Sequence, residues 1–485
     1  MTTDSTSGPE NTLLSLLPLL MLVFLLAGSL ALFGDETTGG PAQVSMIFAG
    51  VAASIIGMMR GKSWDRLEAG TATTVSRAMP IIMIILVIGL LIGLWIVSGV
   101  IPLLIHYGLL LISPDVFYLA TLLISSVVAL ATGSSWSTAG TVGVVLVAVA
   151  ELAGLSPAIC AGAVISGTYF GDKLSPLSDT TNLAAGMTET PLFEHIRNLL
   201  WTTIPAYLVA VIGFSILSAG AAPVLNVERI ESISALLDNR FNLTPWLLVP
   251  VIVTLGSAVF RAPAFLALLA GGIAAAIMGL ATQPGIQELG PSGALMELGQ
   301  AAATGVTAKT GNTELDALLS RGGMASMLPT IWLIISAMFF GGMMEHSGCL
   351  GDIVRLLLKG AKSGAALMLR AGLTSLASNI ITPDQFLSLA VPAQMYNGPF
   401  RERGLKSRNL SRVLEDFGTV SSPLVPWNTC GAYMAGALGV MTIAYLPFCF
   451  FNLASPLIST LYILMKWRVD YEEADPDRSS RKAER

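Results

Sequence analysis

Hydrophobic residues run along the chain in long blocks that short polar segments separate. Blocks about as long as a bilayer-spanning helix cover 12–33, 43–59, 80–105, 157–187, 199–219, 244–260, 262–280, 328–350, 412–440 and 441–465. A helix crosses the hydrocarbon core of a membrane with roughly 20 predominantly apolar residues. The pattern therefore predicts an all-α polytopic membrane protein with about ten spanning helices, and 12–33 is expected to be its retained first helix.

Two pairs of shorter apolar blocks turn on polar centres rich in Gly, Ser, Thr and Pro. The first pair, 116–131 with 142–154, surrounds TGSSWSTAGT, and the second, 363–378 with 384–396, surrounds SNIITPD. Irregular backbone at membrane depth is tolerated only where protein or water surrounds it. We therefore expect two re-entrant hairpins in addition to the spanning helices.

Short motifs recur in the same order in the two halves of the chain. The matching pairs are 93–99 with 342–348, 133–138 with 377–382, and FG-xxx-SPL at 170–177 with 417–424. In the last pair the repeated Ser-Pro interrupts an apolar block, so 172–182 and 418–429 are predicted to be broken helices. Internal repeats with interrupted helices in corresponding positions indicate a binding site near the membrane midplane.

The distribution of Lys and Arg residues orients these elements. Cytoplasmic loops carry an excess of positive charge, and most Lys and Arg residues of this chain fall on the side of the N-terminus, including those in 401–412 and 466–485. Both termini are expected to be cytoplasmic. The first hairpin then enters from the outside and the second from the inside, so the two repeats are inverted.

These patterns divide the chain into five regions. They are 1–79 with the N-terminal helices and a cytoplasmic basic loop, 80–219 as the first inverted repeat, 220–327 as a linker with two helices and extracellular loops, 328–465 as the second inverted repeat, and 466–485 as a cytoplasmic tail.

The composition agrees with an integral membrane protein and narrows its function. Only 12% of the residues are charged and 53% are hydrophobic, whereas average soluble domains carry about 25% charged residues. The sequence has no phosphate-binding GxxxxGK[ST] motif, and its four cysteines lack metal-ligand spacing. We therefore expect no enzyme and no cofactor, with transport driven by ion gradients.

The stretch GTYFGDKLSPLSDTTN at 167–182 places Asp172, Lys173 and Asp179 inside an apolar region. Each ionised group near the bilayer centre costs roughly 2.5–3.5 kcal/mol on insertion scales. A small hard cation such as Na+ prefers oxygen ligands, some of them carbonyls freed where a helix unwinds. We interpret Asp179 as the carboxylate that binds either Na+ or a proton, because ligand-like side chains surround it.

Other polar residues at the predicted breaks and hairpin tips are candidate ligands. They are Asp172, Ser175, Ser178, Thr181 and Asn182 in the first broken helix, Ser134, Ser135 and Thr138 at the first hairpin tip, and Ser378, Asn379, Thr419, Ser422, Asn428 and Thr429 in the second repeat. Lys173 is expected to form an ion pair or a gate, with Ser175, Asp179, Glu415 or Asp416 as partners. His195 falls near a predicted membrane edge and is expected to be solvated.

The segments GTYFGDKLSPLSDTTNLAAG, ATGSSWSTAGTVGV, IGLLIGLWIVSGVIPLLIHYGL and FFGGMMEHSG together resemble the NhaC family of bacterial Na+/H+ antiporters. The resemblance covers about 43–465. Positions that match the family motifs are Thr132, Gly133, Ser135, Asp172, Ser175, Ser178, Asp179, Thr180, Thr181 and Asn182, whereas Ser137 stands where a glycine is expected.

The resemblance implies a transporter in the bacterial inner membrane that exchanges cytoplasmic Na+ for external H+. The alternative is a Na+/H+-coupled exchanger of organic anions such as malate and lactate, because the same family looks to include such exchangers. The expected partners are small ions and the lipid bilayer but not nucleic acid, and a small carboxylate and a second copy of the chain in a homodimer are further candidates. An intramembrane aspartyl protease would not need the two-repeat pattern, and hairpins meeting at the midplane would close the pore of a channel.

Overall fold

The computed structural model describes residues 9–33, 37, 39–111, 114–220, 227–308, 310, 312–358 and 363–472. Within these ranges the regular structure is helical, apart from one isolated β-bridge between Leu405 and Tyr471. The all-α class predicted from the hydrophobic pattern is confirmed.

Eight of the described helical segments are long and apolar enough to cross a membrane, and two sharply bent helix pairs raise this number to ten. Among them are α1 (Pro9–Phe33), α2 (Pro41–Met59), α4 (Met79–Val97), α11 (Leu192–Ala219), α14 (Ala264–Thr282), α18 (Leu328–Ser347) and α20 (Gly364–Ile381). The bent pairs are Ser232–Arg240 with Pro245–Val259 and Thr429–Leu438 with Thr442–Phe448. The prediction of about ten spans in a multi-pass membrane protein is confirmed.

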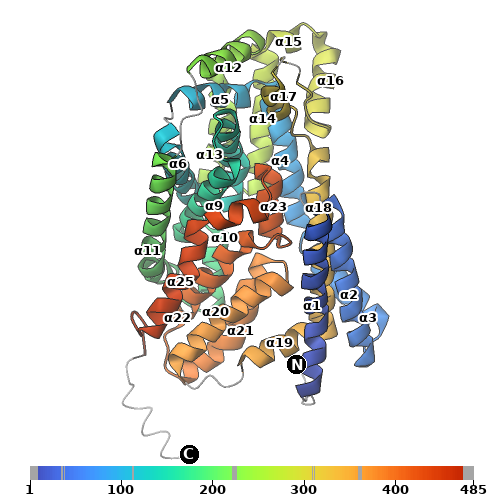
Figure 1. Ribbon diagram of the computed structural model, residues 1–485, viewed down its shortest axis with the longest axis vertical. Helices are drawn as coiled ribbons and strands as arrows, with labels where there is room; N and C mark the ends of the chain where they lie inside the picture. The colour runs from blue at the N-terminus through green and yellow to red at the C-terminus, as the bar shows by residue number, and fades with distance from the viewer. Residues whose placement is uncertain are drawn as a thin grey trace, which may run out of the picture.

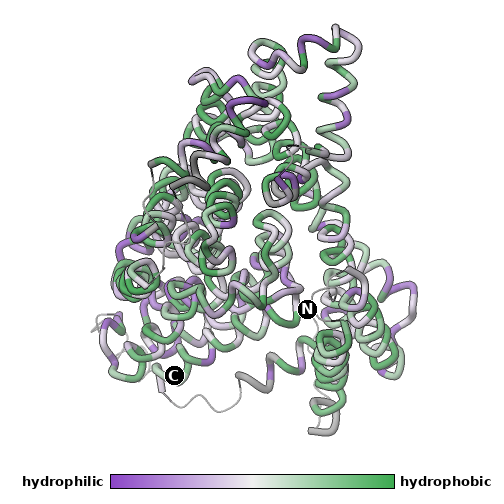
Figure 2. The backbone as a smooth tube through the Cα atoms, turned by 45° about the horizontal axis from the view of Figure 1, so that its top comes forward, coloured by the Kyte–Doolittle hydropathy of each residue, from purple (hydrophilic) through white to green (hydrophobic). Residues whose placement is uncertain are grey.

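The helices are gathered into an elongated body, and the described chain begins and ends near the same end of it (Figure 1). The opposite end carries α12 (Val227–Arg240), α15 (Pro284–Gln287) and α16 (Gly290–Ala303). Hydrophobic residues predominate along the helices, and short hydrophilic stretches lie between them (Figure 2).

The elements of the predicted first repeat follow one another as a long helix, a short helix, a hairpin and a broken helix. After α4 come α5 (Val100–Leu111), α6 (Phe117–Thr132), α7 (Ser135–Thr138), a π-helical turn (Ala139–Gly143), α8 (Val144–Leu152), α9 (Pro157–Leu174), α10 (Asp179–Met187) and α11. Gly133 ends α6 with a left-handed φ of 68°, which glycine adopts readily. The Ser134 hydroxyl then caps α7 by accepting the Ser137 amide.

The second half repeats this order of elements. After α18 come α19 (Cys349–Leu358), α20, α21 (Gln385–Glu402), α22 (Ser407–Leu414), a π-helical turn (Glu415–Thr419), a 3-10 turn (Ser422–Leu424), α23 (Thr429–Leu438), α24 (Thr442–Tyr445) and α25 (Phe450–Leu464). At the second hairpin tip Asp384 has the same capping role as Ser134, since its carboxylate accepts the Leu387 amide in the first turn of α21.

Both predicted helix breaks are present. Helix α9 ends at Leu174 and α10 begins at Asp179, where the Ser178 hydroxyl accepts the Thr181 amide. In the second half Asn428 caps α23 by accepting the Cys430 amide. The Ser-Pro motifs thus end one helix, and a polar cap begins the next.

Three segments differ from the sequence-based expectation. The block 80–105 was expected to be one helix, but it divides into α4 and α5 because Gly99 turns the backbone with φ 87°. The expected basic loop after α2 contains α3 (Trp64–Ser76), which Ser63 caps. In the linker, α12, α15, α16 and α17 (Thr313–Leu319) accompany α13 (Val249–Val259) and α14, where only two helices and loops were predicted.

Glycine lets α9 lie directly against α6. A Cβ added at Gly171 would stand 2.5 Å from both the Leu130 amide nitrogen and the Ser126 carbonyl oxygen. In the second repeat a Cβ at Gly418, which corresponds to Gly171, would stand 2.3 Å from the Ser375 hydroxyl. Each broken helix is therefore packed against the first helix of its own hairpin.

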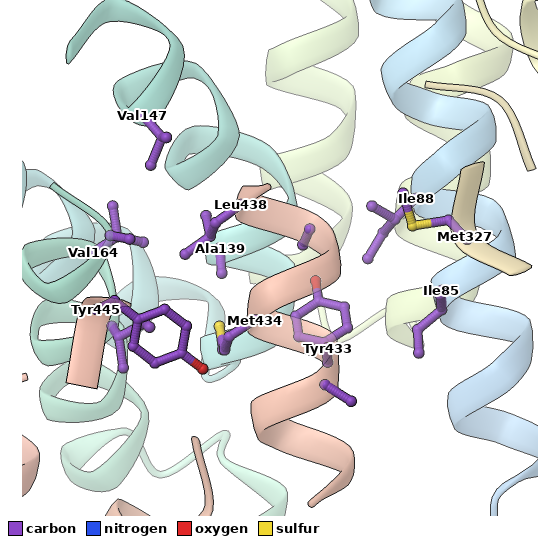
Figure 3. Close-up of a cluster of buried hydrophobic side chains, with 14 of the residues drawn as sticks. Ile85, Ile88, Ala139, Val147, Val164, Met327, Tyr433, Met434, Leu438 and Tyr445 are labelled. Atoms are coloured by element: carbon purple, nitrogen blue, oxygen red, sulfur yellow. The ribbon is translucent and has the colours of Figure 1, made fainter. Parts of the chain in front are cut away.

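The two repeats also share one apolar core. Figure 3 shows Tyr433, Met434 and Leu438 of α23 between Val164 of α9 and Ile88 of α4. All five side chains are buried. The hydrophobic packing therefore joins the second broken helix to the first half of the chain.

We predict that Gly171→Ala destabilises the fold. The added methyl group would meet backbone atoms that cannot move independently, and overpacking of this kind costs about 1–3 kcal/mol. Thermal unfolding in detergent should show a lower midpoint than the wild type.

Gly186→Ala is the matched control, because a Cβ at Gly186 in α10 has no neighbour within 4 Å. Its midpoint should equal that of the wild type or exceed it slightly, since alanine favours helix. Equal midpoints for the two variants would contradict the close packing of α6 and α9.

Candidate functional site

The first broken helix holds a buried carboxylate at its end. Asp172, in the last turn of α9, is 6% exposed. Its Oδ2 accepts hydrogen bonds from the Ser135 hydroxyl at 2.7 Å and from the Ser135 amide at 3.2 Å. The tip of the first hairpin therefore supplies the donors for the carboxylate of the broken helix.

The hairpin tip is held in this position by a close contact with the helix break. A Cβ at Gly133 would stand 2.5 Å from Leu177 Cβ, so only glycine fits there. Thr138 fixes the first turn of α7, because its hydroxyl donates to the Ser134 carbonyl and lies 3.3 Å from the Thr132 hydroxyl. The predicted tip residues Ser134, Ser135 and Thr138 therefore lie beside the break.

The unwound segment between α9 and α10 is satisfied by its own hydroxyls. Ser175 accepts the Leu177 amide at 3.3 Å, and the Thr181 hydroxyl donates to the Lys173 carbonyl at 3.1 Å. Ser178 caps α10 and faces the Asp172 carboxylate. This segment thus presents hydroxyl and carbonyl oxygens next to a carboxylate, a set that suits a hard cation.

Asp179, the predicted ion-binding carboxylate, is less buried than Asp172. It is the first residue of α10 and is exposed, as is Asn182, whose amide donates to the Pro176 and Ser178 carbonyls. The reason is helical phase, since Ser178 and Thr181 occupy the buried side of the turn. Asp172, and not Asp179, holds the buried position.

Lys173 forms a fully buried ion pair across the two repeats. Its Nζ lies 2.5 Å from Asp416 Oδ1, and both side chains are 0% exposed. The same Oδ1 accepts the Thr202 hydroxyl at 2.9 Å, and Nζ also donates to the Ser455 hydroxyl at 3.0 Å. Of the partners considered for Lys173, the structure selects Asp416.

Glu415 is buried without a hydrogen-bond partner. It is 0% exposed, and neither carboxylate oxygen forms a hydrogen bond within the described part of the chain. The Thr419 hydroxyl faces it without a well-aligned hydrogen bond, and the charges of Lys173 and Asp172 act on it. Glu415 belongs to the π-helical turn, a form frequent at functional sites.

Two asparagines organise the second break. Asn379 at the end of α20 donates to the Gly418 carbonyl at 2.5 Å and to the Ser421 hydroxyl at 2.9 Å. Asn428 donates to the Asn379 side-chain oxygen at 3.1 Å, and Thr429 follows as the first residue of α23. These side chains are buried, and the amide groups of both asparagines donate to protein partners.

Near the second helix break, two hydroxyl groups have no hydrogen-bond partner within the described part of the chain. Ser378 and Thr419 are buried, and their hydroxyl oxygens have no hydrogen-bond partner among the described residues. Ser422 instead donates to the Thr419 carbonyl at 2.7 Å and lies 3.4 Å from the Tyr169 hydroxyl. The second repeat therefore offers neutral oxygens and one bare carboxylate.

Several contacts of the site were not predicted from the sequence. Thr202 of α11 and Ser455 of α25 support the ion pair, and Tyr433 stacks on Trp136 with ring centroids 4.1 Å apart while donating to the Trp136 carbonyl. These partners lie far apart along the chain, and an isolated Ser, Thr or Tyr in an apolar block gives no local signal. His195 was expected to be solvated but is fully buried, with Nδ1 2.8 Å from the Ser411 hydroxyl.

The donor set suits alkali cations and protons rather than transition metals. Among the described residues no group of three or more His, Cys, Asp and Glu side chains could hold a metal ion. The four cysteines are buried free thiols. The chemistry available is therefore carboxylate, hydroxyl and carbonyl oxygen.

Comparisons with known proteins agree with this chemistry. The sequence profile of the Na+/H+ antiporter family matches residues 167–467, which include both broken helices. The chain is similar to the Na+/H+ antiporter NhaC of Alkalihalophilus pseudofirmus, with 34% identity over 420 residues that cover 87% of this chain and 89% of that one.

Two proteins of Bacillus subtilis are similarly related. The Na+/H+ antiporter NhaC shares 35% identity over 425 residues, covering 87% of this chain and 92% of the relative. The malate-2H+/Na+-lactate antiporter shares 33% identity over 426 residues, covering 87% and 89%. The resemblance expected from the motifs is confirmed.

We predict that breaking the buried ion pair destabilises the protein more than removing it. Lys173→Met or Asp416→Leu leaves one charge buried without its partner, a loss of about 3–5 kcal/mol, whereas replacing both partners by apolar residues is often neutral. Thermal unfolding of the two single variants and the double variant forms a double-mutant cycle that measures the coupling.

The double variant should recover much of the stability that each single variant loses. Additive losses would mean that the two charges do not stabilise one another and would contradict the pairing.

Proposed function

Because the chain belongs to the NhaC family of Na+/H+ antiporters, we propose that it exchanges cytoplasmic Na+ for external H+ by alternating access. The proposal treats the protein as a secondary transporter without an enzymatic step. Na+ and H+ are its substrates, and the bilayer is its medium.

The observation that carries the proposal is the pair of buried carboxylates Asp172 and Glu415. One has hydroxyl and amide donors, and the other has none. An ionised carboxylate buried without partners costs several kcal/mol. Glu415 is therefore stable when it carries a proton or when a cation lies beside it.

The two carboxylates provide a physical basis for exchange. Their charges interact, so a Na+ ion bound at Asp172 favours the release of a proton from Glu415, and protonation of Glu415 weakens the attraction for Na+. Ser135 and Ser178 stand beside Asp172, and Thr419 stands beside Glu415. We assign Asp179, which is exposed at the start of α10, to the entrance of this site rather than to the exchange itself.

The energetic cost of moving the site across the membrane without a bound ion explains why access would alternate. Crossing with both carboxylates ionised and unoccupied would carry uncompensated charge through a low-dielectric region. Crossing with Na+ or with a proton bound avoids this cost. The Lys173–Asp416 pair, which is satisfied internally, would keep the two broken helices together in both cases.

Exchange of organic anions is the second candidate, because one relative is named as a malate-2H+/Na+-lactate antiporter. A substrate carboxylate would need a cation or free amide donors to bind it. Lys173 is engaged by Asp416, and Arg412 donates to Asn198 and to the Arg468 carbonyl. This occupancy favours the simple cation antiporter.

We predict that Asp172→Asn and Glu415→Gln each reduce exchange to the level of protein-free vesicles. Both changes keep side-chain size but remove the charge that binds Na+ or a proton. Proteoliposomes loaded with Na+ and diluted into Na+-free buffer should acidify inside with the wild type, and a lumenal pH dye measures the change.

Asp179→Asn is the matched control, since it neutralises an exposed carboxylate of the same segment. It should retain exchange with a weaker apparent affinity for Na+. Loss of exchange in Asp179→Asn together with normal exchange in Glu415→Gln would return the central role to Asp179. Acidification that requires added malate or lactate would identify the organic-anion exchanger.

A further inference from the structure

A second polar site lies at the surface of the described chain, away from the two buried carboxylates. The first turns of α11, the start of α22 and the segment after α25 enclose a pocket of about 710 Å³. Three arginines, Arg197, Arg408 and Arg468, line it together with Phe193 and Trp201. None of these residues takes part in the ion exchange proposed above.

Both acidic residues of the pocket pair with the same arginine, Arg408. Arg408 lies 2.9 Å from Glu194 Oε1 and 2.9 Å from Asp470 Oδ2. Arg197 and Arg468 are exposed, and neither forms an ion pair within the described residues. Three arginines against two carboxylates give the pocket a net positive charge, and two of its arginines have no carboxylate partner in the described part of the chain, which suits an anion.

The backbone holds Arg468 in place before any ligand binds. Its φ of 54° is left-handed, a conformation that a non-glycine residue keeps only when its surroundings impose it. Arg412, which is buried, donates to the Arg468 carbonyl at 2.9 Å. The Arg468 guanidinium stands 3.6 Å above the Trp201 ring, which orients it by a cation–π contact.

An exposed apolar stripe leads away from the pocket along α11. Its members, spaced four residues apart and 36–66% exposed, are Leu200, Ile204, Leu208, Ile212 and Ile216. Helix α25, which packs beside α11, exposes Leu457, Leu461 and Leu464. In a spanning helix such residues face the acyl chains of the bilayer.

We propose that this pocket binds the headgroup of an anionic phospholipid. Arg197 and Arg468 would contact the phosphodiester, with Phe193 and Trp201 at the level of the membrane interface and the acyl chains along the stripe on α11. Arginine binds phosphate oxygens through paired N–H donors, and basic pockets between spanning helices are known to take anionic headgroups. The continuity of the pocket with the stripe favours a lipid over a soluble anion.

Binding would stabilise the contact between α11 and α22. Asn198 of α11 donates to the Arg408 carbonyl and accepts from Arg412, so the pocket walls are already joined by hydrogen bonds. A phosphodiester bridging Arg197 and Arg468 would add the segment after α25 to this contact. The resistance of the detergent-solubilised protein to heat is therefore a direct readout.

The test compares the wild type with the double variant Arg197→Gln/Arg468→Gln in detergent, titrated with phosphatidylglycerol or with phosphatidylcholine. Phosphatidylglycerol should raise the unfolding midpoint of the wild type, and phosphatidylcholine should not. The double variant should need a roughly 25-fold higher phosphatidylglycerol concentration, because each arginine at a charged membrane surface contributes about a factor of five in affinity. Arg401→Gln is the control, since Arg401 is exposed but pairs with Glu189 outside the pocket.

A second measurement does not depend on the stability of the variant. Brominated phosphatidylglycerol in mixed vesicles should quench the tryptophan fluorescence of the wild type more than brominated phosphatidylcholine does. Trp201→Phe should reduce this difference, and the remainder should come from Trp467, whose ring centroid lies 6.4 Å from that of Trp201. Equal quenching by the two lipids, or equal stabilisation of the wild type and the double variant, would overturn the proposal. Stabilisation of the wild type by inorganic phosphate as strong as by phosphatidylglycerol would identify a soluble-anion site instead.

Discussion

The fully buried ion pair between Lys173 and Asp416 constrains the centre of the molecule. Two charges removed from water are tolerated only when they compensate one another and the remaining donors and acceptors are filled. Thr202 and Ser455 supply those hydrogen bonds, so four separate elements converge on one point. The position of α9 relative to the second π-helical turn is therefore specified by electrostatics as well as by packing.

Around this ion pair the two repeats have the same backbone features but different functional side chains. Each has a capped hairpin tip, a glycine where the broken helix touches its hairpin, and a polar cap after the break. The first repeat adds Asp172 with its donors, and the second adds Glu415 without any. The backbone of the two repeats is similar but their side chains differ. As a result, one carboxylate with hydrogen-bond donors and one without them in the described part of the chain lie in the same region.

The sequence predicted the elements of this fold better than the roles of its charges. Apolar blocks and Ser-Pro breaks are local signals, so the spans and the interruptions at 172–182 and 418–429 could be placed. The amphipathic helix α3 lacks the apolar length of a span, so the hydrophobic pattern alone does not distinguish it from a polar loop. Whether Asp172 or Asp179 is buried depends on the phase with which α10 begins, and the choice between Glu415 and Asp416 for Lys173 depends on contacts more than two hundred residues away in the chain.

The stack of Trp136 on Tyr433 restricts how the protein can change shape. The Tyr433 hydroxyl also donates a hydrogen bond to the Trp136 carbonyl. The stack and this hydrogen bond together hold the tip of the first hairpin against the broken helix of the second repeat. Pulling the repeats apart would break this aromatic contact and a desolvated ion pair together. A motion that preserves both carries the hairpin tip, α9 and α23 as one block past the surrounding helices. In the proposed exchange, the permeability barrier would then move around the ion, while the ligands proposed for the ion stay in place.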